Sequence, residues 1–547
     1  MSKINIVALG GLNENGKNMY VVQVEKDIFI FDAGLKYDTG TVLGVDYVIP
    51  DFNFIRNNIK NIKGVFITHS HEENIGAIPA LVQEFPTLPI YVTKYTSLVL
   101  NRKFELMGIK KANIKVIESY KKISFGAVSV FPMNVTHSVP DAVGYVINTP
   151  DGAIFYTGNY TFDFAMDGAF KSDIGKLAYI GKQNVLCLLG ESIYAEKKGH
   201  TSPKHRIEGV VQNTLRKNPG RIIFNSYPSE LFRIKELLQE IMKTNRKIVI
   251  MGKKLQNTID DAMNNNYIDF DKKRIGDLKN VNDPNVVLLI ANDFENPFGH
   301  ISRIARGQDK YITIDARDTV MFTEPVFDGT EKLAVDVSNE MAKIGAQVIV
   351  LSQKEHLLHH ASQEDIKLMV NLMSPKYYMP VAGEYRHQVM NADAAVHGGF
   401  NKQNILLKLN GDVVSFIDGE LNINAKDTVK VDDVFIDGKS TMDVGELVLR
   451  DRDMLGNDGV VIVWVTIDKT THKLISGPEI ATRGFVYVKD NIDLVKELSS
   501  LSKNIIVDEL EHNEIDYNNI KNRIREKLNR YIYDQTECKP MIITVVM

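Results

Sequence analysis

Cysteine is nearly absent from this chain, which has two among 547 residues, Cys187 and Cys538. They lie far apart, and neither has a Cys or His neighbour at a zinc-binding spacing, so we expect neither a structural disulfide nor a cysteine zinc site. No apolar run reaches the roughly 18 residues that a membrane-spanning helix needs. The N-terminus also lacks the apolar core of a signal peptide. These absences predict a cytoplasmic protein that does not enter a membrane.

A surplus of positive charge is also missing. The formal net charge is −4 and the pI is about 6.4. A protein that binds nucleic acid through nonspecific electrostatics usually carries a basic surplus. Such a binder is disfavoured here, and any RNA that binds this chain has to be held by a shaped channel.

The length and the 44% hydrophobic content predict three or four domains, because one core does not grow to this size. The first part, 1–203, alternates short β-rich runs with turns. Its run at 64–68 is typical of a buried strand and ends on a cluster of histidines, and a helix is expected from Gly76 onward. Chemistry in a layered α/β fold commonly lies at such a carboxyl end of a strand.

The middle of the chain changes pattern twice. Strand–helix repeats over 204–345 indicate an α/β insertion with its own parallel sheet. The stretch 346–421, which begins with an apolar run at 346–351, returns to the style of the first part. The insertion therefore interrupts one larger α/β core.

The remaining residues are interpreted as a linker and a small domain. The stretch 422–455 begins with many Asp, Lys and Gly residues, which are typical of a linker. The last part, 456–547, predicts a small α+β domain, with a strand at 459–465, a helical region at 492–512 and a closing strand at 541–546.

Three histidines follow predicted strands. His69 and His71 lie two residues apart after the run 64–68, and His137 follows another apolar run. Neutral imidazoles that converge on one point, with an open position for water, are ligands of a hydrolytic zinc site. An isolated H-x-H pair is more often two solvated loop histidines. The third histidine, together with the run TGN at 157–159, favours a metal site.

The order of these motifs resembles that of the metallo-β-lactamase superfamily, which has H-x-H, a strand-end histidine and then T-G-[DN]. Further segments resemble ribonuclease J and keep its order along essentially the whole chain. They are LGVD at 43–46, IPD at 49–51, ASQED at 361–365, GEYR at 383–386, DVGELVLRDR at 443–452 and GPEIATRGFVYV at 477–488. The sequence is therefore identified as a member of the ribonuclease J family.

This resemblance implies a fold and an activity. The fold is a metallo-β-lactamase αβ/βα core, formed by 1–203 and 346–421, with an inserted β-CASP α/β domain at 204–345 and a small C-terminal α+β domain at 456–547 that serves assembly. The activity is 5′-to-3′ exonuclease and endonuclease cleavage of RNA with a 5′-monophosphate. It uses two divalent metal ions, usually zinc or manganese.

The metal-binding residues depart from those of the family. The motif H-x-H-x-D-H becomes HSHEEN here, so Glu73 replaces an aspartate and Asn74 replaces a histidine. Asn159 replaces the bridging aspartate, and Ala382 replaces a late histidine. A second ion is not expected, because one carboxylate rarely holds a divalent ion alone. One Zn²⁺ or Mn²⁺ can still bind at the three remaining ligands, with Glu73 as a candidate catalytic base: His69, His71 and His137.

The β-CASP motifs are changed as well. The family pattern H-V-S-G-H-[GA]-S becomes HLLHHAS at 356–362, so Leu358 replaces a serine of the 5′-phosphate pocket. The GSQGEP-like loop of the family is replaced by NDFENP at 292–297. Specific recognition of a 5′-monophosphate is therefore not expected. The matching residues His356, His360 and Ser362 are predicted to contact substrate, and His360 is also predicted to be catalytic.

Three functions are open at this point. The first is a weakly active or inactive subunit of RNA processing and decay that binds RNA. It would partner an active ribonuclease J paralogue. A homo- or hetero-oligomer is expected to form through the C-terminal domain. The second is a slow single-zinc 5′-to-3′ exo- and endoribonuclease that uses the three histidines. The third is a scaffold without RNA contact, and the retention of His360 and Ser362 disfavours it.

Overall fold

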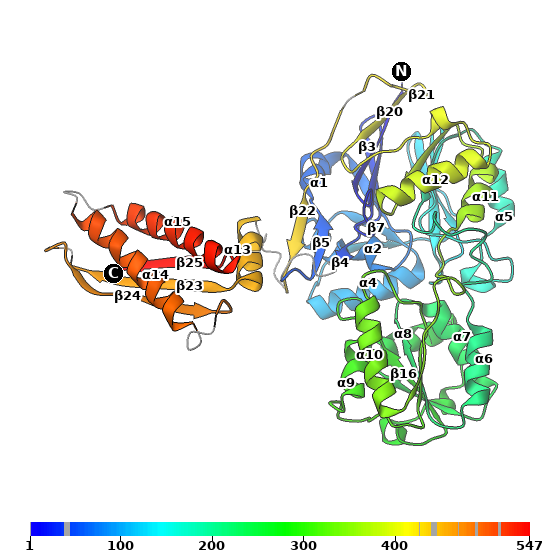
Figure 1. The fold of residues 1–547 in the computed structure, drawn as a ribbon. Coiled ribbons are helices and arrows are strands. Elements are labelled where there is room, and N and C mark those ends of the chain that lie inside the picture. Colours follow the sequence, from blue (N-terminus) through cyan, green and yellow to red (C-terminus); the bar gives the residue numbers. More distant parts are fainter. Residues whose placement is uncertain are drawn as a thin grey trace. The chain divides into compact units, whose positions relative to one another are not determined.

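The computed structural model describes residues 2–37, 44–425, 427–438, 446–468, 470–486, 491–511 and 516–547. The chain forms two compact units, one of residues 1–37 and 47–434 and the other of 38–46 and 435–547 (Figure 1). Each unit has its own cluster of buried apolar residues. In the described ranges no helix is both long and apolar enough to cross a membrane.

The larger unit contains a sandwich of two sheets. Phe31 and Phe66 of one sheet stack on each other and contact Tyr145 of the other, within one apolar cluster shared by both sheets. The sheets have the strand orders β21-β20-β1-β2-β3-β6-β7-β8 and β19-β13-β12-β11-β10-β9. The strands of the first are β1 Lys3–Gly10, β2 Met19–Val24, β3 Asp27–Phe31, β6 Ile62–Phe66, β7 Pro89–Val92, β8 Asn113–Val116, β20 Val413–Ile417 and β21 Glu420–Leu421. Those of the second are β9 Ile123–Phe125, β10 Val128–Asn134, β11 Val143–Thr149, β12 Gly152–Tyr156, β13 Val185–Glu191 and β19 Tyr377–Val381.

Helices pack on the outside of this sandwich. Phe155 and Leu188, on the outer face of the second sheet, share an apolar cluster with residues of α5, α11 and α12. The helix expected from Gly76 is α3, with Pro79 in its first turn. The αβ/βα core that the resemblance implied is thereby confirmed. Its helices are α1 Asn53–Asn58, α2 Glu72–Ile75, α3 Ile78–Glu84, α4 Lys94–Met107, α5 Ile174–Gly181, α11 Gln363–Met373 and α12 Tyr385–His397.

The insertion has a five-stranded sheet of its own, in the order β15-β16-β14-β17-β18. All neighbouring strands are parallel, as the strand–helix repeats predicted. Apolar residues such as Leu288 and Val320 fill its core. The strands are β14 Ile222–Ser226, β15 Lys247–Met251, β16 Val286–Ala291, β17 Thr319–Phe322 and β18 Gln347–Ile349. The helices are α6 Glu208–Lys217, α7 Leu231–Met242, α8 Lys253–Asn264, α9 Gly299–Ala305 and α10 Glu331–Ile344 (Figure 1).

Strand β18 does not lie where its sequence placed it. The apolar run at 346–351 was expected to return to the larger core, but β18 pairs in parallel with β17 in the inserted sheet. Helix α10 supplies the crossover that a parallel neighbour requires. A short apolar run has the same pattern in either sheet, so its sequence does not say which one it joins.

Among its described residues, the smaller unit has a three-stranded sheet, β24-β23-β25, and three helices. Its strands are β23 Val460–Ile467, β24 Leu474–Arg483 and β25 Met541–Val546, and its helices are α13 Glu446–Asn457, α14 Ile492–Leu510 and α15 Tyr517–Thr536. Alternate residues of β23, such as Val461 and Val463, are buried with Leu498 of α14 and Ile524 of α15. The predicted small α+β fold is confirmed.

The stretch interpreted as a linker, 422–455, contains regular structure. It includes β22 Asp433–Ile436, which belongs to a three-stranded sheet in the order β22-β5-β4, and most of α13. The other two strands of that sheet are β4 Lys36–Tyr37 and β5 Tyr47–Pro50. The domain boundaries drawn from the sequence stay a prediction.

Candidate metal centre

Three histidines meet at the carboxyl ends of core strands. His69 closely follows β6, His71 immediately precedes α2, and His137 follows β10. All three side chains are buried, and one ligand atom of each lies within 4.8 Å of the others. The ring centroids are 4.5 to 4.8 Å apart. The structure therefore brings together the three histidines that the sequence selected.

The outer nitrogens of two of these imidazoles are held by backbone carbonyls. His137 Nδ1 lies 2.8 Å from the carbonyl oxygen of His359, and His71 Nε2 lies 3.3 Å from that of Ser229. The Ser138 hydroxyl is also 3.2 Å from His71 Nε2. A carbonyl only accepts, so these two nitrogens carry hydrogens. His137 Nε2 and His71 Nδ1, which are 3.3 Å apart, are then the atoms left for an ion.

His69 is held in the same manner by the core. Its Nδ1 lies 2.9 Å from Thr68 Oγ1, and that hydroxyl lies 3.0 Å from both carboxylate oxygens of Asp32. The hydroxyl donates to Asp32 and thus accepts from His69 Nδ1. In the described part of the chain, His69 Nε2 is buried without a hydrogen-bond partner. Such a nitrogen costs free energy, and an ion among the three rings would satisfy it.

The protonation of the three rings differs. Burial holds the pKa values of His69 and His137 well below the usual range, so both are neutral and able to bind a metal ion. Burial opposes protonation of His71 too, but the carboxylates of Glu73 and Glu230 raise its pKa to about 9. Burial likewise opposes ionisation of Glu73, yet His71, 3.3 Å away, lowers the pKa of Glu73 to about 2. Without an ion, the buried His71 and the partly exposed Glu73 form an ion pair.

The donor set fits one ion. Among the described residues, the mutually close ligand atoms come from the three histidines and from no carboxylate. Three neutral imidazoles with one open position form an ordinary zinc site. Glu73 contacts His71 and does not belong to this set. Its role as a base stays a prediction.

Asn74, Asn159 and Ala382 stand where the resemblance implied further metal ligands. One of them makes a different contact, and the other two make no side-chain hydrogen bond among the described residues. Asn74 donates from Nδ2 to Asp32 Oδ2 at 2.8 Å. Asn159 is buried, and neither polar atom of its side chain has a partner among the described residues. Ala382 has no donor atom and occupies the left-handed region, with φ of 53°. Among the described residues, these three positions add no ligand atom to the histidine cluster.

Asp32 supports the arrangement and was not selected from the sequence. Its buried carboxylate accepts from the backbone and hydroxyl of Thr68, from Asn74 and from the hydroxyl of Tyr156. Burial raises the pKa of Asp32 to about 6, although these donors oppose the rise. Its position at the end of β3, beside the strand that leads to His69, is the signal that could have identified it.

The predicted substrate contacts occupy different environments. His360 lies beside His137, with centroids 5.5 Å apart, and its Nδ1 is 2.8 Å from Glu191 Oε2. Ser362 is fully buried, caps α11 and lies 2.7 Å from the Thr201 hydroxyl. His356 is partly exposed and does not line the cavity at the histidines. The roles of these residues stay predictions.

Two of the three histidines, His71 and His137, border a cavity of about 110 Å³. Its aromatic wall includes Phe294 and Phe327, and Phe294 stacks between Tyr37 and Tyr227, with centroids 6.1 and 4.2 Å away. All of the lining residues lie within the described ranges, and none of them is lysine or arginine. They are His71, Glu72, Glu73, His137, Ser138, Ser229, Glu230, Phe294, Phe327, Leu358, His359 and His360.

Sequence reasoning missed several lining residues, among them Ser229 and Glu230. They precede helix α7 of the inserted domain and reach His71, which is 158 residues away from Ser229. No local pattern could have identified them, because only the docking of the inserted domain brings them to the histidines.

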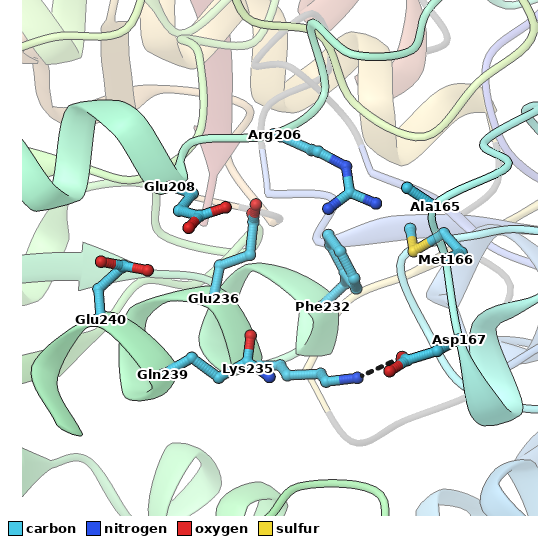
Figure 2. A pocket seen from close by; sticks show the side chains of 10 residues that line it. All are labelled: Ala165, Met166, Asp167, Arg206, Glu208, Phe232, Lys235, Glu236, Gln239 and Glu240. Atoms are coloured by element: carbon cyan, nitrogen blue, oxygen red, sulfur yellow. Dashed lines mark hydrogen bonds and ion pairs between the residues drawn. The ribbon is translucent and has the colours of Figure 1, made fainter. Parts of the chain in front are cut away.

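A second cavity, also of about 110 Å³, lies along α7 (Figure 2). It contains none of the residues that the sequence selected. Phe232 lines it and also packs on His359, with centroids 5.2 Å apart. Arg206, Glu208, Lys235 and Glu236 make this cavity polar.

Known proteins resemble this chain along its whole length. Family models match for the ribonuclease J C-terminal domain at residues 447–547, the ribonuclease J beta-CASP domain at 219–341 and the beta-lactamase superfamily domain at 29–175. Ribonuclease J2 of Bacillus subtilis (strain 168) is 36% identical over 548 residues, which cover 100% of this chain and 98% of the relative. Ribonuclease J 2 of Staphylococcus aureus (strain MRSA252) is 34% identical, over 99% of this chain and 98% of the relative.

A solved structure shares the fold. A protein of unknown function from Enterococcus faecalis V583 superposes with a TM-score of 0.54 at 17% identity, over 76% of this chain and 100% of that one. At this identity the likeness concerns the fold alone.

Proposed function

The chain belongs to the ribonuclease J family of RNA-processing proteins, and from this premise we propose that it is a weakly hydrolytic or inactive subunit that assembles with an active ribonuclease J. The observation that carries the proposal is the loss of second-ion donors at Asn74, Asn159 and Ala382 while the three histidines stay together. A pair of ions can stabilise both the attacking and the leaving oxygen of a phosphodiester. A single ion cannot stabilise both oxygens at once.

The residues at the cavity support slow chemistry. Zinc held by the three histidines would act as a Lewis acid toward a phosphodiester. Glu73 is the carboxylate that can take up a proton, but its ion pair with His71 lowers its pKa to about 2 despite burial, which makes it a weak base at pH 7. His360, oriented by Glu191, lies on the cavity wall, where its ring can donate to a phosphate oxygen.

The cavity is also poorly suited to an RNA 5′-phosphate. Phosphate is commonly held by arginine, lysine or backbone N–H groups. The lining contains Glu72, Glu73 and Glu230 and neither Lys nor Arg, and Leu358 and Phe294 add apolar surface. Negative side chains repel a phosphate, so specific capture of a monophosphorylated end is expected to be weak.

An apolar sheet face in the smaller unit supports assembly. Residues of β23 and β25 that point away from α14 and α15 lie opposite each other in register, as in the pair Trp464 and Val545. Ile543 and Val545 are 42% and 38% exposed. Apolar residues gathered on one exposed face are typical of an interaction site. We propose this face as the assembly surface, with an active paralogue as the partner. The face consists of Val460, Ile462, Trp464, Met541, Ile543 and Val545.

A slow single-zinc 5′-to-3′ exo- and endoribonuclease is the second candidate. The observation in its favour is that a protein oxygen holds one nitrogen of each imidazole. The second nitrogens of His71 and His137 face each other at 3.3 Å, and that of His69 is buried without a partner among the described residues.

The first experiment separates these functions. For wild type and His71→Ala we would measure the zinc and manganese content of the purified chain and its association with an active paralogue. We would also measure the binding and the decay of 5′-monophosphate RNA, with and without that paralogue. Weak or no decay by the chain alone, with stable association with the paralogue, is expected. Fast metal-dependent decay by the chain alone, abolished by His71→Ala, would contradict the subunit function and favour the nuclease. No decay and no RNA binding, with or without the paralogue, would indicate a scaffold.

The second experiment tests the surface. Trp464→Glu places a charge on the proposed assembly surface and should abolish co-elution with the paralogue in size-exclusion chromatography. The matched control is Val507→Glu, which changes an apolar residue that is 43% exposed on α14. Equal co-elution of both variants would contradict the surface, and a chain that pairs only with itself would contradict the proposed partner.

A further inference from the structure

Two of the three imidazoles are held by segments from outside the histidines' own part of the core. Ser229 and Glu230, between β14 and α7, contact His71 Nε2, with the Ser229 carbonyl at 3.3 Å and Glu230 Oε1 at 3.6 Å. The carbonyl of His359, between β18 and α11, holds His137 at 2.8 Å. His69, in contrast, is held by its neighbour Thr68.

Glu230 is in an unusual position for an acidic residue. It is 5% exposed, and within the described ranges its Oε2 is buried without a hydrogen-bond partner. In the same ranges its ion pair is with His71 alone. A buried carboxylate costs free energy unless a charged or hydrogen-bonding partner offsets the cost. The contact with His71 is the interaction that can offset it.

We propose that Glu230 is a positioning residue for the metal centre, and that it makes ion binding by the three histidines depend on the inserted domain. His71 Nε2 donates to the Ser229 carbonyl at 3.3 Å and lies 3.6 Å from Glu230 Oε1. In this orientation Nδ1 faces His137 Nε2 at 3.3 Å. An acceptor on the outer nitrogen of a metal-binding imidazole fixes the ring and makes its inner nitrogen a better ligand. The Ser138 hydroxyl is also within reach, but it is uncharged.

The neighbouring buried carboxyl group does not compete for this role. Burial raises the pKa of Glu324 to about 8, and the charge of Glu230 contributes to the rise. Glu324 is therefore neutral at pH 7. It is already bonded to the hydroxyls of Ser226 and Thr323. Of these two carboxyl groups of the inserted domain, Glu230 is the one that contacts His71, with Oε1 3.6 Å from Nε2.

The arrangement couples two equilibria. An ion that binds to the oriented rings stabilises the docked position of the 229–230 segment, and docking of that segment in turn strengthens ion binding. The inference concerns the orientation of the histidines and does not depend on whether the chain hydrolyses RNA.

A matched control lies on the helix that follows Glu230. Glu236 of α7 is also 5% exposed, but it lines the second cavity with Arg206 and Lys235 (Figure 2). It accepts from the backbone N–H of Ile207. Glu236→Gln removes an equally buried carboxyl group from α7 without touching His71.

The test compares the full-length wild type with Glu230→Gln, Glu230→Ala and Glu236→Gln. Zinc affinity would be measured by competition with a chromophoric chelator. The visible absorption spectrum of the cobalt-loaded proteins would report the geometry of the ligands. We expect Glu230→Gln and Glu230→Ala to weaken zinc binding by about 10- to 100-fold, the usual cost of losing such an outer partner. We also expect an altered cobalt spectrum for both, whereas Glu236→Gln matches the wild type. Thermal unfolding in EDTA checks that every variant is folded.

Three results would overturn the proposal. These are a wild type that binds no zinc, a Glu230→Gln protein with wild-type affinity and cobalt spectrum, and an equal loss in Glu236→Gln. None of these measurements uses RNA, so their outcome is independent of the decay and association assays for the proposed function.

Discussion

The metal centre has two halves, which differ in their side chains: the three histidines form one, and the positions of Asn74, Asn159 and Ala382 form the other. In one half, each of the three histidines is buried with one nitrogen bonded to a protein oxygen and the other directed inward. In the other half, Asn74 has become a hydrogen-bond donor to Asp32, and Asn159 is buried without a partner. Ala382 contributes no donor there.

The difference shows what keeps a ligand in place. The histidines are held by hydrogen bonds to Thr68, Ser229 and His359, so the protein maintains their positions without an ion. Asn74, Asn159 and Ala382 stand where the family has further ligands, and the surrounding fold forms with these replacements.

Removing one histidine should have the largest effect on this comparison. His137→Ala deletes a ligand, so zinc affinity should fall by more than about 100-fold, because the loss of an outer partner alone costs about 10- to 100-fold. Asn159→Ala, the control from the other half, should leave zinc affinity unchanged. Metal analysis after dialysis against a weak chelator measures both. Zinc loss in Asn159→Ala would show that the second half still takes part in ion binding.

Restoring the second half should have the next largest effect. The combined change Glu73→Asp, Asn74→His, Asn159→Asp and Ala382→His returns the family's ligands. We expect two ions per chain and an increase of about 100-fold in RNA hydrolysis, since a second ion stabilises the transition state by several kcal/mol and each 1.36 kcal/mol is tenfold. Metal content and initial rates measure the change. Two ions without faster hydrolysis would place the remaining defect in the substrate contacts.

The pH dependence of ion binding should distinguish the rings within the first half. His69 and His137 are neutral throughout the neutral range, but Glu73 and Glu230 raise the pKa of His71 to about 9 against the effect of burial. Below that pH an ion has to displace a proton from His71. Apparent zinc affinity should therefore rise about tenfold per pH unit toward pH 9 and then level off. A flat profile between pH 6 and 8 would contradict a protonated His71.

The smallest effect is expected for the structural role that Asn74 has taken. Asn74→Ala removes a donor from the buried carboxylate of Asp32, which should lower the free energy of unfolding by about 1–3 kcal/mol. Zinc affinity should not change. Urea unfolding in EDTA measures the stability, and unchanged stability would mean that water replaces the amide.

Much of the fold and part of the centre could be predicted from the sequence. The parallel inserted sheet follows from strand–helix repeats, and His69, His71 and His137 follow from their places after strands. Strand β18 could not be placed, because a short apolar run carries no information about which sheet it joins. The closing strand of the smaller unit, 541–546, was predicted with its observed bounds.

The sequence by itself determined which ligands exist: three imidazoles in the right order along the chain, and no donors at Asn159 and Ala382 suited to a second ion. Only the tertiary structure decided which nitrogen of His71 and of His137 faces inward. The carbonyls that decide this lie 158 and 222 residues away from the histidines they hold. Hydrogen bonds at such separations form only once the inserted domain and its return segment have packed onto the core. No local pattern of residues can specify them.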